Sequence, residues 1–466
     1  MAPCCDVGMH VTVVGGGLTG ALAALYLASR GYVVDVYEAR ADPRHAAPAA
    51  AASPSALRDA ALRKAADASR RSINLALSTR GLRALGRVGL AERALEMAVP
   101  MHGRVIHDKR GKLRLQPYGA AAHEVLYSVS RVGMNIMLLD ELEQRRNVRL
   151  HFGCKCVALR EDGSATFEKA AGGVVEVEAG RLLGCDGAFS AVRALMGRVT
   201  RLSVSLEYID SGYKELAMPA GKDGKHAMPP HGLHIWSSGE LMLIALPNND
   251  GSFTCTLFGP FRTLESVRTA EEVLRFFETH FPDAVGLMPD LTSDYINNPI
   301  GALSTVRCSP WNFNQMLLLG DAAHGVVPFY GQGMNCGFED CIELDDALEA
   351  TGHDWAAALP IFAAERKQAT DALADLALDN YIEMRDKTVD RLFLLKCRVH
   401  AVLHALLGSS YWQPSLHTAV SFTTMPYHVA RSVCERQDRI LARAALVGAG
   451  LVASAALWVA RRPSLR

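Results

Sequence analysis

The chain begins with apolar residues whose spacing changes twice between His10 and Glu38. A β-branched run, VTVV, is followed by three glycines, then by alanine and leucine at helical spacing, and then by a second apolar run, VVDVYE. Short β-branched runs favour strands, whereas the longer period between them favours a helix. The order of strand, glycine turn, helix and strand predicts a βαβ unit.

Beyond this unit the hydrophobic pattern predicts three further regions. Residues 200–300 contain short alternating apolar runs such as LHIWSS and SFTCTLFGP, which favour an antiparallel sheet. From about residue 337 onward, alanine and leucine recur at helical spacing. We therefore predict an α/β protein with a discontinuous Rossmann-like domain, a sheet-bearing second domain and C-terminal helices. The predicted ranges are 8–200 with 300–385, then 200–300, then 386–440.

Residues 41–70 interrupt the Rossmann-like pattern. They are rich in alanine and contain Pro43, Pro48 and Pro54. This composition is typical of an insertion or a surface loop.

The last helical stretch has the composition of a membrane segment. Residues 444–460 carry no charge, and Arg443 and Arg461 flank them. A helix rises about 1.5 Å per residue, so this run lies near the lower limit for a hydrocarbon core of roughly 30 Å. We predict a transmembrane anchor helix at residues 441–460. The N-terminus lacks the regions of a signal peptide.

Length, charge and cysteine content limit the number of domains, the partners and the compartment that we expect. The 466 residues suggest two to three domains, and 49 basic against 49 acidic residues leave no net charge to attract nucleic acid. The 11 cysteines are odd in number and scattered, which favours a reducing compartment over a secreted disulfide framework. No Cys or His pairs complete a metal site, so we assign no metal ligand.

The glycines of the βαβ unit match a dinucleotide fingerprint. Gly15 makes the turn, Gly17 lets the backbone approach a pyrophosphate, and Gly20 lets the helix pack on the strand. Glu38 ends the second strand, at the distance where a ribose hydroxyl is met. The pattern predicts a dinucleotide at the N-terminus of the helix.

Two later stretches indicate which dinucleotide binds. In LLGCDGAFSAVR (182–193), Asp186 ends an apolar run before a helix that Ser190 can cap. In MLLLGDAAHGVVPFYGQGMN (316–335), Asp321 ends a strand, and a helix after Gly333 directs its free amides at whatever lies before it. An isoalloxazine ring gains negative charge on reduction and needs such a partner. The three motifs together predict an FAD-binding domain.

These motifs resemble those of the single-component flavin hydroxylases related to p-hydroxybenzoate hydroxylase. Within that family, the kynurenine 3-monooxygenases are similar over nearly the whole chain. The similar stretches are DVYEAR, RSINLALS, VPMHGRVIH, YSVSR, LHIW, SFTCTLF, FPDA and NYIEMR.

The resemblance implies site residues for cofactor and substrate. Arg104 would pair with the carboxylate of an amino-acid substrate, and Tyr118 and Asn380 would contact the same substrate. The residues implied in FAD binding are Gly15, Gly17, Thr19, Glu38, Arg40, Ala76, Arg131, Asp321, Met334 and Asn335.

The resemblance also implies a reaction and a location. The kynurenine 3-monooxygenases hydroxylate L-kynurenine to 3-hydroxykynurenine through a flavin C4a-hydroperoxide and consume NADPH and O2. No second Rossmann unit is evident for NADPH, so we expect the nicotinamide to bind transiently on the FAD domain. Members from eukaryotes are anchored through the C-terminus in the mitochondrial outer membrane, facing the cytosol, and we expect the same here.

The chain departs from the family at two places, and two other functions stay open. His417 in HTAVSF stands where the family has a tyrosine, and the insertion at 41–70 separates DVYEAR from RSINLALS. One alternative is another membrane-associated FAD hydroxylase or epoxidase that acts on a lipid. That function requires a wholly apolar pocket, which a buried Arg104 would disfavour. The other alternative is a non-catalytic escort protein with a flavin fold.

Overall fold

The glycine-interrupted pattern at the N-terminus forms the βαβ unit that the sequence predicts. β1 (His10–Val14) and β2 (Val33–Glu38) pair in parallel, and α1 (Leu18–Ser29) connects them. The structure is a computed structural model that describes residues 9–45, 74–108, 110–119, 123–178, 180–382 and 391–460. Of the predicted insertion at 41–70, residues 46–70 lie outside this description.

The βαβ unit lies within a six-stranded sheet with the order β18-β19-β12-β1-β2-β8. Four of its five pairings are parallel, and only the edge strand β18 runs antiparallel to its neighbour. The remaining strands are β8 (Val148–Phe152), β12 (Arg181–Gly184), β18 (Asn312–Phe313) and β19 (Met316–Leu318). Residues from both ends of the predicted discontinuous domain therefore share one sheet.

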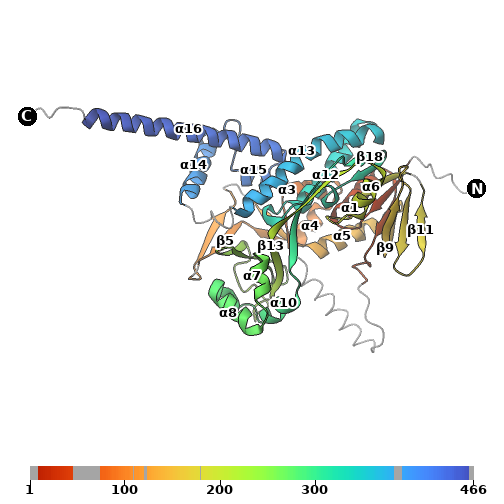
Figure 1. Cartoon of the computed structure of the whole chain (residues 1–466), viewed down its shortest axis with the longest axis horizontal. Coiled ribbons are helices and arrows are strands. Elements are labelled where there is room, and N and C mark those ends of the chain that lie inside the picture. Colours follow the sequence, from red (N-terminus) through yellow and green to blue (C-terminus); the bar gives the residue numbers. More distant parts are fainter. Residues whose placement is uncertain are drawn as a thin grey trace, which may run out of the picture.

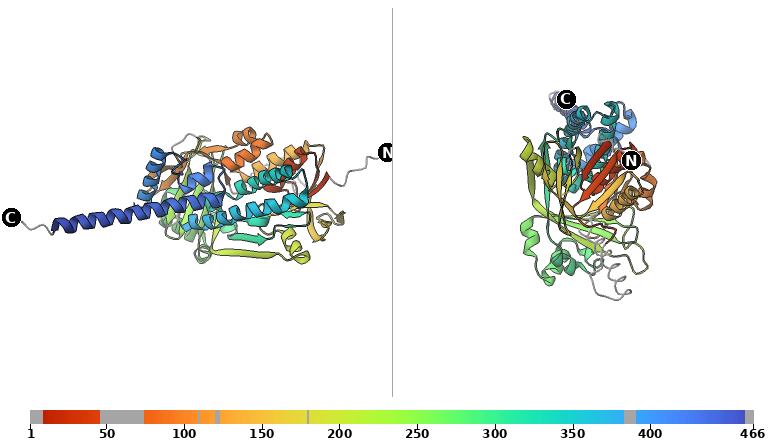
Figure 2. Two further views of the ribbon diagram at one scale, coloured as in Figure 1. Left: turned by 90° about the horizontal axis from the view of Figure 1, so that it is seen from above. Right: turned by 90° about the vertical axis from the view of Figure 1, so that its right-hand side faces the viewer.

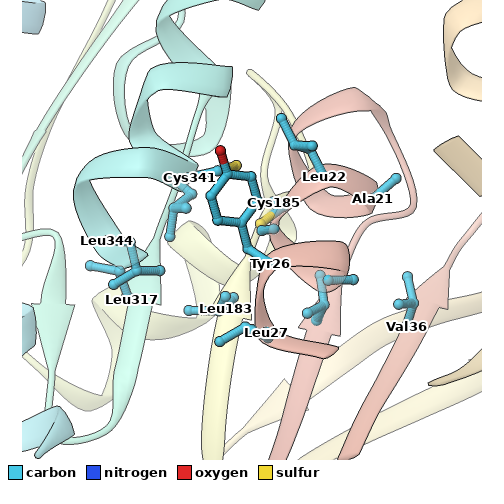
Figure 3. Close-up of a cluster of buried hydrophobic side chains, with 14 of the residues drawn as sticks. Ala21, Leu22, Tyr26, Leu27, Val36, Leu183, Cys185, Leu317, Cys341 and Leu344 are labelled. Carbon is cyan, nitrogen blue, oxygen red and sulfur yellow. The ribbon is translucent and has the colours of Figure 1, made fainter. Parts of the chain in front are cut away.

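The main hydrophobic core lies between this sheet and the helices that cover it. α12 (Gly333–Ala350) packs against α1 through Tyr26, Cys341 and their apolar neighbours, as Figure 3 shows. Nine consecutive residues of α1, Gly20 to Ala28, are buried. A helix that is buried on all sides must be apolar all round, which explains its run of alanine and leucine.

A second sheet, of seven strands, has the order β17-β13-β16-β15-β14-β5-β6. Its pairings are antiparallel except for β14 with β5. The strands are β5 (Gly103–His107), β6 (Leu113–Pro117), β13 (Ser203–Met218), β14 (Leu233–Ser238), β15 (Leu241–Pro247), β16 (Phe253–Gly259) and β17 (Gly301–Ser309). The antiparallel sheet predicted for 200–300 thus exists, and strands from outside that range extend it at both edges.

Short helices cover one face of the seven-stranded sheet. They are α7 (Phe261–Ser266), α8 (Ala270–His280), α9 (Pro282–Val285) and α10 (Leu291–Asn297). Their apolar side chains join those of β13 to β16 in a separate core. Figure 1 shows α8 and α10 below the sheet, on the side away from the C-terminal helices. The other face of the sheet is therefore the one directed at the start of α12 and at the C-terminal helices.

Two three-stranded sheets and several helices complete the N-terminal part. One sheet has the order β3-β7-β4 and the other β11-β10-β9. The strands are β3 (Asn74–Leu77), β4 (Val99–Met101), β7 (Leu126–Ser130), β9 (Cys154–Leu159), β10 (Ala165–Lys169) and β11 (Val174–Val177). The helices are α3 (Thr79–Arg87), α4 (Ala91–Glu96), α5 (Arg131–Glu143), α6 (Ala191–Val199) and α11 (Asp321–His324).

The C-terminal part is helical, as the sequence predicts. It comprises α13 (Trp355–Ile382), α14 (Arg391–Leu407), α15 (Leu416–Phe422) and α16 (Tyr427–Ala460). Figures 1 and 2 show α16 extending away from the body of the molecule towards the C-terminus.

The structure does not support the predicted transmembrane segment at 441–460. These residues form the end of the single long helix α16 rather than a separate element. Within the described residues, no helix has an apolar stretch long enough to cross a bilayer. The uncharged run 444–460 has about the minimum length for crossing a bilayer, and it is rich in small residues.

Candidate active site

The first glycine loop is shaped by close packing at two of its glycines and is open at the third. A side chain at Gly15 would meet the backbone of Cys185 at 2.5 Å, and one at Gly20 would meet the carbonyl oxygen of Gly15 at 2.0 Å. Gly15 also has a φ of 105°, which favours glycine. At Gly17 nothing lies within 4 Å of an added Cβ. The loop therefore presents an open backbone face at the N-terminus of α1.

Glu38 lies directly beside this loop, as its position at the end of β2 predicts. Its carboxylate accepts hydrogen bonds from the backbone N–H of Gly16 at 2.8 Å and from Nε of Arg40 at 2.8 Å. Burial raises the pKa of Glu38, but the bonds from Arg40 and Gly16 outweigh this effect and hold the pKa below its ordinary value. Glu38 is thus a buried anion that can accept from sugar hydroxyls, while the Arg40 side chain is 74% exposed.

A second helix begins next to the first. Thr19, in the first turn of α1, lies against Gly337 of α12, where an added Cβ would be 2.5 Å from the Thr19 hydroxyl. Neither α1 nor α12 has a side chain hydrogen-bonded at its N-cap. Two sets of free backbone amides therefore lie close together, which favours an anionic ligand.

Asp321 lies at the entrance to this region. It follows β19 and starts α11, and its neighbour Gly320 is packed against Thr19. The Asp321 side chain is exposed and makes no hydrogen bond with another residue that the structure describes. The exposed Asp321 carboxylate is therefore available to accept hydrogen bonds from a ligand.

Asn335 connects α12 to the strand that carries Ala76. Its amide donates to the carbonyl of Ala76 at 2.8 Å and to that of Gly331 at 2.9 Å, and its oxygen accepts from the N–H of Ser78 at 2.9 Å. All hydrogen-bonding groups of this buried amide are therefore used within the protein. Met334 is adjacent and partly buried against the main core. Asn335 thus fixes the loop that begins α12.

Arg131 and Asp186 take different positions from the other motif residues. Arg131 is exposed at the start of α5 and lies near Glu215 of β13, whose pKa burial raises and Arg131 lowers. Asp186 accepts from the N–H groups of Ala191 and Val192, and Ser190 caps α6 as predicted. The Asp186 carboxylate therefore caps the N-terminus of α6.

Sequence reasoning missed Asn135, which lies one turn after Arg131 in α5. Its amide donates to the carbonyl of Gly16 at 3.0 Å. This bond ties α5 to the glycine loop. The spacing of four residues from Arg131 places both on one face of a helix, and that spacing was a signal in the sequence.

Aromatic rings cluster around Tyr118, one of the implied substrate residues. Tyr118 is 8% exposed, and its ring stacks on that of His417 at 5.3 Å between centroids. Phe422 and Tyr330 lie 6.2 and 5.9 Å from the same histidine ring. Since Tyr118 comes from the loop after β6 and His417 from α15, the C-terminal helices contribute to this aromatic cluster.

Two polar groups beside these rings have no hydrogen-bond partner among the described residues. The hydroxyl of Tyr118 is buried and forms no hydrogen bond with any described residue. The half-buried guanidinium of Arg104 likewise forms no hydrogen bond or ion pair within the described part of the chain. Burial raises the pKa of Tyr118 to about 12, and burial together with Arg104 lowers the pKa of His417 to about 3. Arg104 is therefore a cation beside a neutral histidine and a neutral phenol.

Asn380 lies on the neighbouring helix α13. Its amide donates to the carbonyl of Phe329 at 2.7 Å, and it is 6% exposed. The Phe329 ring stacks on Tyr381 at 4.2 Å, and Tyr381 bonds Ser211 at 2.9 Å. Asn380 thus braces the segment that precedes the α12 loop.

A buried group of charges behind the α12 loop was also missed. Asp340 accepts from Nε of Arg366 at 2.8 Å, from the N–H of Gly320 at 3.0 Å, and lies 2.6 Å from Nε2 of His324. His324 and Asp340 lie within reach of Cys336, a geometry that can hold a metal ion. Arg366, however, contacts both Asp340 and the Cys336 sulfur, so a cation already occupies this cluster.

Comparison with known proteins identifies the family. A family described as FAD binding domain matches residues 8–377. The chain is 44% identical to a kynurenine 3-monooxygenase of Salinispora arenicola, over 97% of each chain. It is 38% identical to a kynurenine 3-monooxygenase of Sus scrofa, over 98% of this chain and 93% of the other. The chain belongs to the kynurenine 3-monooxygenase family.

A solved structure agrees in fold. The tetrameric form of 2-methyl-3-hydroxypyridine-5-carboxylic acid oxygenase superposes with a TM-score of 0.63 at 19% identity, covering 85% of this chain and 95% of the other. The α/β fold predicted from the sequence is therefore confirmed. The family model and the relatives confirm membership of the flavin hydroxylases.

The geometry of the site fits the FAD that this family requires. The open face at Gly17 and the uncapped start of α1 suit a pyrophosphate, and the buried Glu38 carboxylate suits a ribose. The uncapped start of α12 suits the flavin end, where negative charge develops on reduction. Ala76 connects the two sites, because it contacts Gly331 of the α12 loop and packs in the same cluster as Tyr118.

Proposed function

We propose that this FAD-dependent monooxygenase hydroxylates the aromatic ring of L-kynurenine, ortho to the amine, to give 3-hydroxykynurenine, with NADPH and O2 as co-substrates. Membership of the kynurenine 3-monooxygenase family supports this function. The single structural observation that carries it is Arg104, a half-buried cation that has no partner among the described residues and lies beside the rings of Tyr118 and His417.

The substrate would bind the Arg104 guanidinium and the Tyr118 hydroxyl. An α-amino acid presents a carboxylate that can pair with Arg104, and a ketone or amine that can bond the Tyr118 hydroxyl. The rings of Tyr118, Tyr330 and Phe422 would enclose the aniline ring and exclude water. Asn380 would position the Phe329–Tyr330 segment. FAD, when bound, supplies the redox and oxygen chemistry, and these residues bind and orient the substrate.

The FAD contacts are proposed from the same geometry. Gly15, Gly17 and Thr19 would meet the pyrophosphate, and Glu38 with Arg40 the ribose. The remaining proposed contacts are Ala76, Arg131, Asp321, Met334 and Asn335. We also propose the domain division 8–200 with 300–385 for FAD, 200–300 for the substrate sheet and 386–440 for the C-terminal helices.

The two alternative functions fit the site less well. A lipid substrate would leave the Arg104 guanidinium and the Tyr118 hydroxyl without partners in an apolar environment, which is costly. A non-catalytic escort protein has no need for two adjacent uncapped helix N-termini at an open glycine loop. Neither alternative finds support among the relatives.

The proposed function is tested by NADPH oxidation with the purified, yellow holoenzyme. We expect L-kynurenine to stimulate oxidation and mass spectrometry to show a product with one added oxygen atom. Benzoate and a long-chain lipid serve as comparison compounds. Stimulated oxidation without a hydroxylated product would show that kynurenine is only an effector.

We further propose that the end of α16 attaches the protein to a membrane surface. The side chains of Leu446, Val447 and Leu451 are 64–73% exposed on a part of α16 that extends beyond the body in Figure 2. Exposed neighbouring apolar groups on a helix favour a lipid interface. The relatives include bacterial and animal proteins, so the mitochondrial outer membrane stays a prediction. Removal of residues 440–466 should release the protein from carbonate-washed membranes, and equal release of both forms would contradict this proposal.

A further inference from the structure

Three of the stretches that carry the family resemblance meet behind the substrate sheet. VPMHGRVIH contributes His107 at the end of β5, and LHIW contributes His234 and Trp236 in β14. FPDA contributes Asp283 in α9. The proposed reaction uses none of these four side chains.

The four side chains form a continuous hydrogen-bonded chain. Oδ2 of Asp283 lies 2.6 Å from Nδ1 of His107, and Nε2 of His107 lies 2.8 Å from Nδ1 of His234. Nε2 of His234 lies 2.8 Å from the carbonyl oxygen of Pro229. The indole N–H of Trp236 donates to Asp283 at 2.9 Å and so fixes the carboxylate.

The three hydrogen bonds made by the two imidazoles need one more proton than two neutral imidazoles carry. The carbonyl of Pro229 and the carboxylate of Asp283 accept only, so the outer nitrogens of His234 and His107 must both carry hydrogen. The inner pair of nitrogens, 2.8 Å apart, needs a third hydrogen between them. Two neutral rings supply only two hydrogens, so all three contacts form only when the pair binds an additional proton.

Asp283 favours the additional proton on the histidine pair, whereas burial restricts its binding to low pH. His234 is 0% and His107 7% exposed. Burial lowers the pKa of His234 to about 4, and it lowers that of His107 despite the opposing effect of Asp283. Asp283 is the charged group that faces the pair, while Trp236 stacks on His107 at 3.7 Å and Phe253 meets His234 at 5.5 Å. The additional proton is therefore bound below the usual range of histidine.

The hydrogen-bonded side chains hold the strand that carries Arg104, which is β5. β14 and β5 pair in parallel, with Leu233 opposite Arg104 and Trp236 opposite His107. Side chains alternate along a strand, so Arg104 faces the side on which Tyr118 and His417 lie, while His107, three residues on, faces the helices behind the sheet. The hydrogen-bonded chain thus fastens one end of this strand to α9.

We propose that His107, His234 and Asp283 form a proton-sharing positioning unit, which holds the strand of Arg104 and thereby makes the binding of the amino-acid substrate depend on pH. This proposal rests on the proposed role of Arg104. None of the three residues is a proposed substrate contact. When the additional proton is lost, one of the three contacts is missing and the strand is held less firmly.

The first experiment follows the protons directly. The holoenzyme with 15N-labelled histidine is studied by NMR between pH 3.5 and 8.0, with His107→Asn and His234→Asn variants to assign the resonances. We expect the coupled pair to take up one proton below pH 6.5, and we expect Asp283→Asn to abolish this uptake. If both rings keep one proton each over the whole range, the shared proton does not exist and the proposal is wrong.

The second experiment measures KM and kcat for L-kynurenine over the same pH range. We expect KM to rise about two- to tenfold as the pH rises through the midpoint found by NMR, the range of one lost hydrogen bond, with little change in kcat. In His234→Asn the amide can donate to a neutral His107, so this step in KM should disappear. His231→Asn, which removes an exposed neighbouring imidazole, serves as the matched control.

The outcomes separate this proposal from the proposed function. A His234→Asn variant that unfolds at lower temperature but keeps the wild-type pH profile of KM would assign the cluster a purely structural role and overturn the proposal. An Arg104→Ala variant with unchanged KM would instead refute the substrate role of Arg104, and with it the effect on KM, while the NMR result would still stand.

Discussion

At the scale of single residues, Arg104 is the most informative side chain. Its guanidinium has no protein partner among the described residues, and a neutral histidine and phenol lie beside it. We predict that Arg104→Ala raises the KM for L-kynurenine by about one to two decades, because a charge-assisted bond contributes about 1.5–3 kcal/mol. Steady-state kinetics of the holoenzyme measure this.

The control for this prediction is Arg104→Lys, which keeps the charge but not the forked geometry. It should recover part of the affinity. FAD content, measured by absorbance, should match the wild type in both variants. Unchanged KM in the alanine variant would return Arg104 to the role of a surface charge.

His417 gives a prediction about stability and pH. Its pKa is about 3 in the folded protein because of burial and Arg104, against about 6.5 when unfolded. Between these values the unfolded chain binds more protons, so the free energy of unfolding falls as the pH falls, by up to about 1.4 kcal/mol per unit. We predict that His417→Gln loses less stability between pH 6.5 and 4.5 than the wild type, as measured by urea denaturation.

The exposed His45 offers a comparison for this experiment. Its side chain is 81% exposed, so His45→Gln is the control that removes an exposed imidazole in place of a buried one. An equal loss of stability in the His417→Gln and wild-type proteins would mean that the buried imidazole is protonated in the folded state.

The sequence could identify such residues only where a motif surrounds them. Arg104 was predicted from VPMHGRVIH, but its lack of a partner depends on which strands and helices enclose it. His107, His234 and Asp283 stand in three separate stretches, and only the pairing of β5 with β14 and the packing of α9 bring them together. Contacts between residues more than a hundred positions apart leave no periodic signal in one sequence.

At the scale of elements, the glycines of the first turn allow a paired prediction. Gly17→Ala places a methyl group in open space, so the apoprotein should unfold at the wild-type temperature while FAD binds more weakly. Gly20→Ala would place a methyl group 2.0 Å from the Gly15 carbonyl oxygen and should lower the unfolding temperature itself. Thermal unfolding of the apoproteins and FAD titration measure the two effects.

The contrast between these two variants is the critical result. If both lower FAD affinity to the same extent without a difference in apoprotein stability, the loop does not pack as the structure has it. If Gly17→Ala binds FAD normally, the open face at Gly17 is not the approach for the pyrophosphate.

Elements with a strong local pattern were predicted well. The βαβ unit, the antiparallel sheet and the C-terminal helices each follow from periodicity. The extension of the second sheet by β5, β6 and β17 was not evident, because edge strands from distant parts of the chain are recruited by packing. The transmembrane prediction at 441–460 considered the uncharged run alone, whereas this run is the end of α16, whose first turns belong to the core.

At the scale of the whole molecule, buried charges join the C-terminal helices to the cofactor domain. Arg80 of α3 is 1% exposed and donates to the carbonyl of Val420 at 3.0 Å, to that of Met425, and to Glu339 of α12 at 2.5 Å. The ring of Tyr427, at the start of α16, lies 4.1 Å from its guanidinium. The same α12 carries the loop proposed to meet the flavin, so the C-terminal helices support the active site from behind.

This arrangement predicts different outcomes for two truncations. Deletion of 440–466 removes a part of α16 with exposed side chains and leaves every contact of Arg80 in place, so the unfolding temperature and the FAD content should stay near the wild type. Deletion of 416–466 removes both carbonyl partners and the Tyr427 ring, which leaves a buried guanidinium with one carboxylate. Loss of partners around a buried charge costs about 3–5 kcal/mol, so this form should fold poorly.

Thermal unfolding and flavin absorbance of the two truncated proteins test this prediction. A third protein carries Arg80→Met in the 416–466 deletion. Methionine fills a similar volume without a charge, so this substitution should partly rescue the folding of that deletion. That rescue separates the unpaired charge from the loss of apolar packing. A 440–466 deletion that loses its flavin would show that the distal part of α16 acts on the active site, and the division of α16 into a packed start and a free end would be wrong.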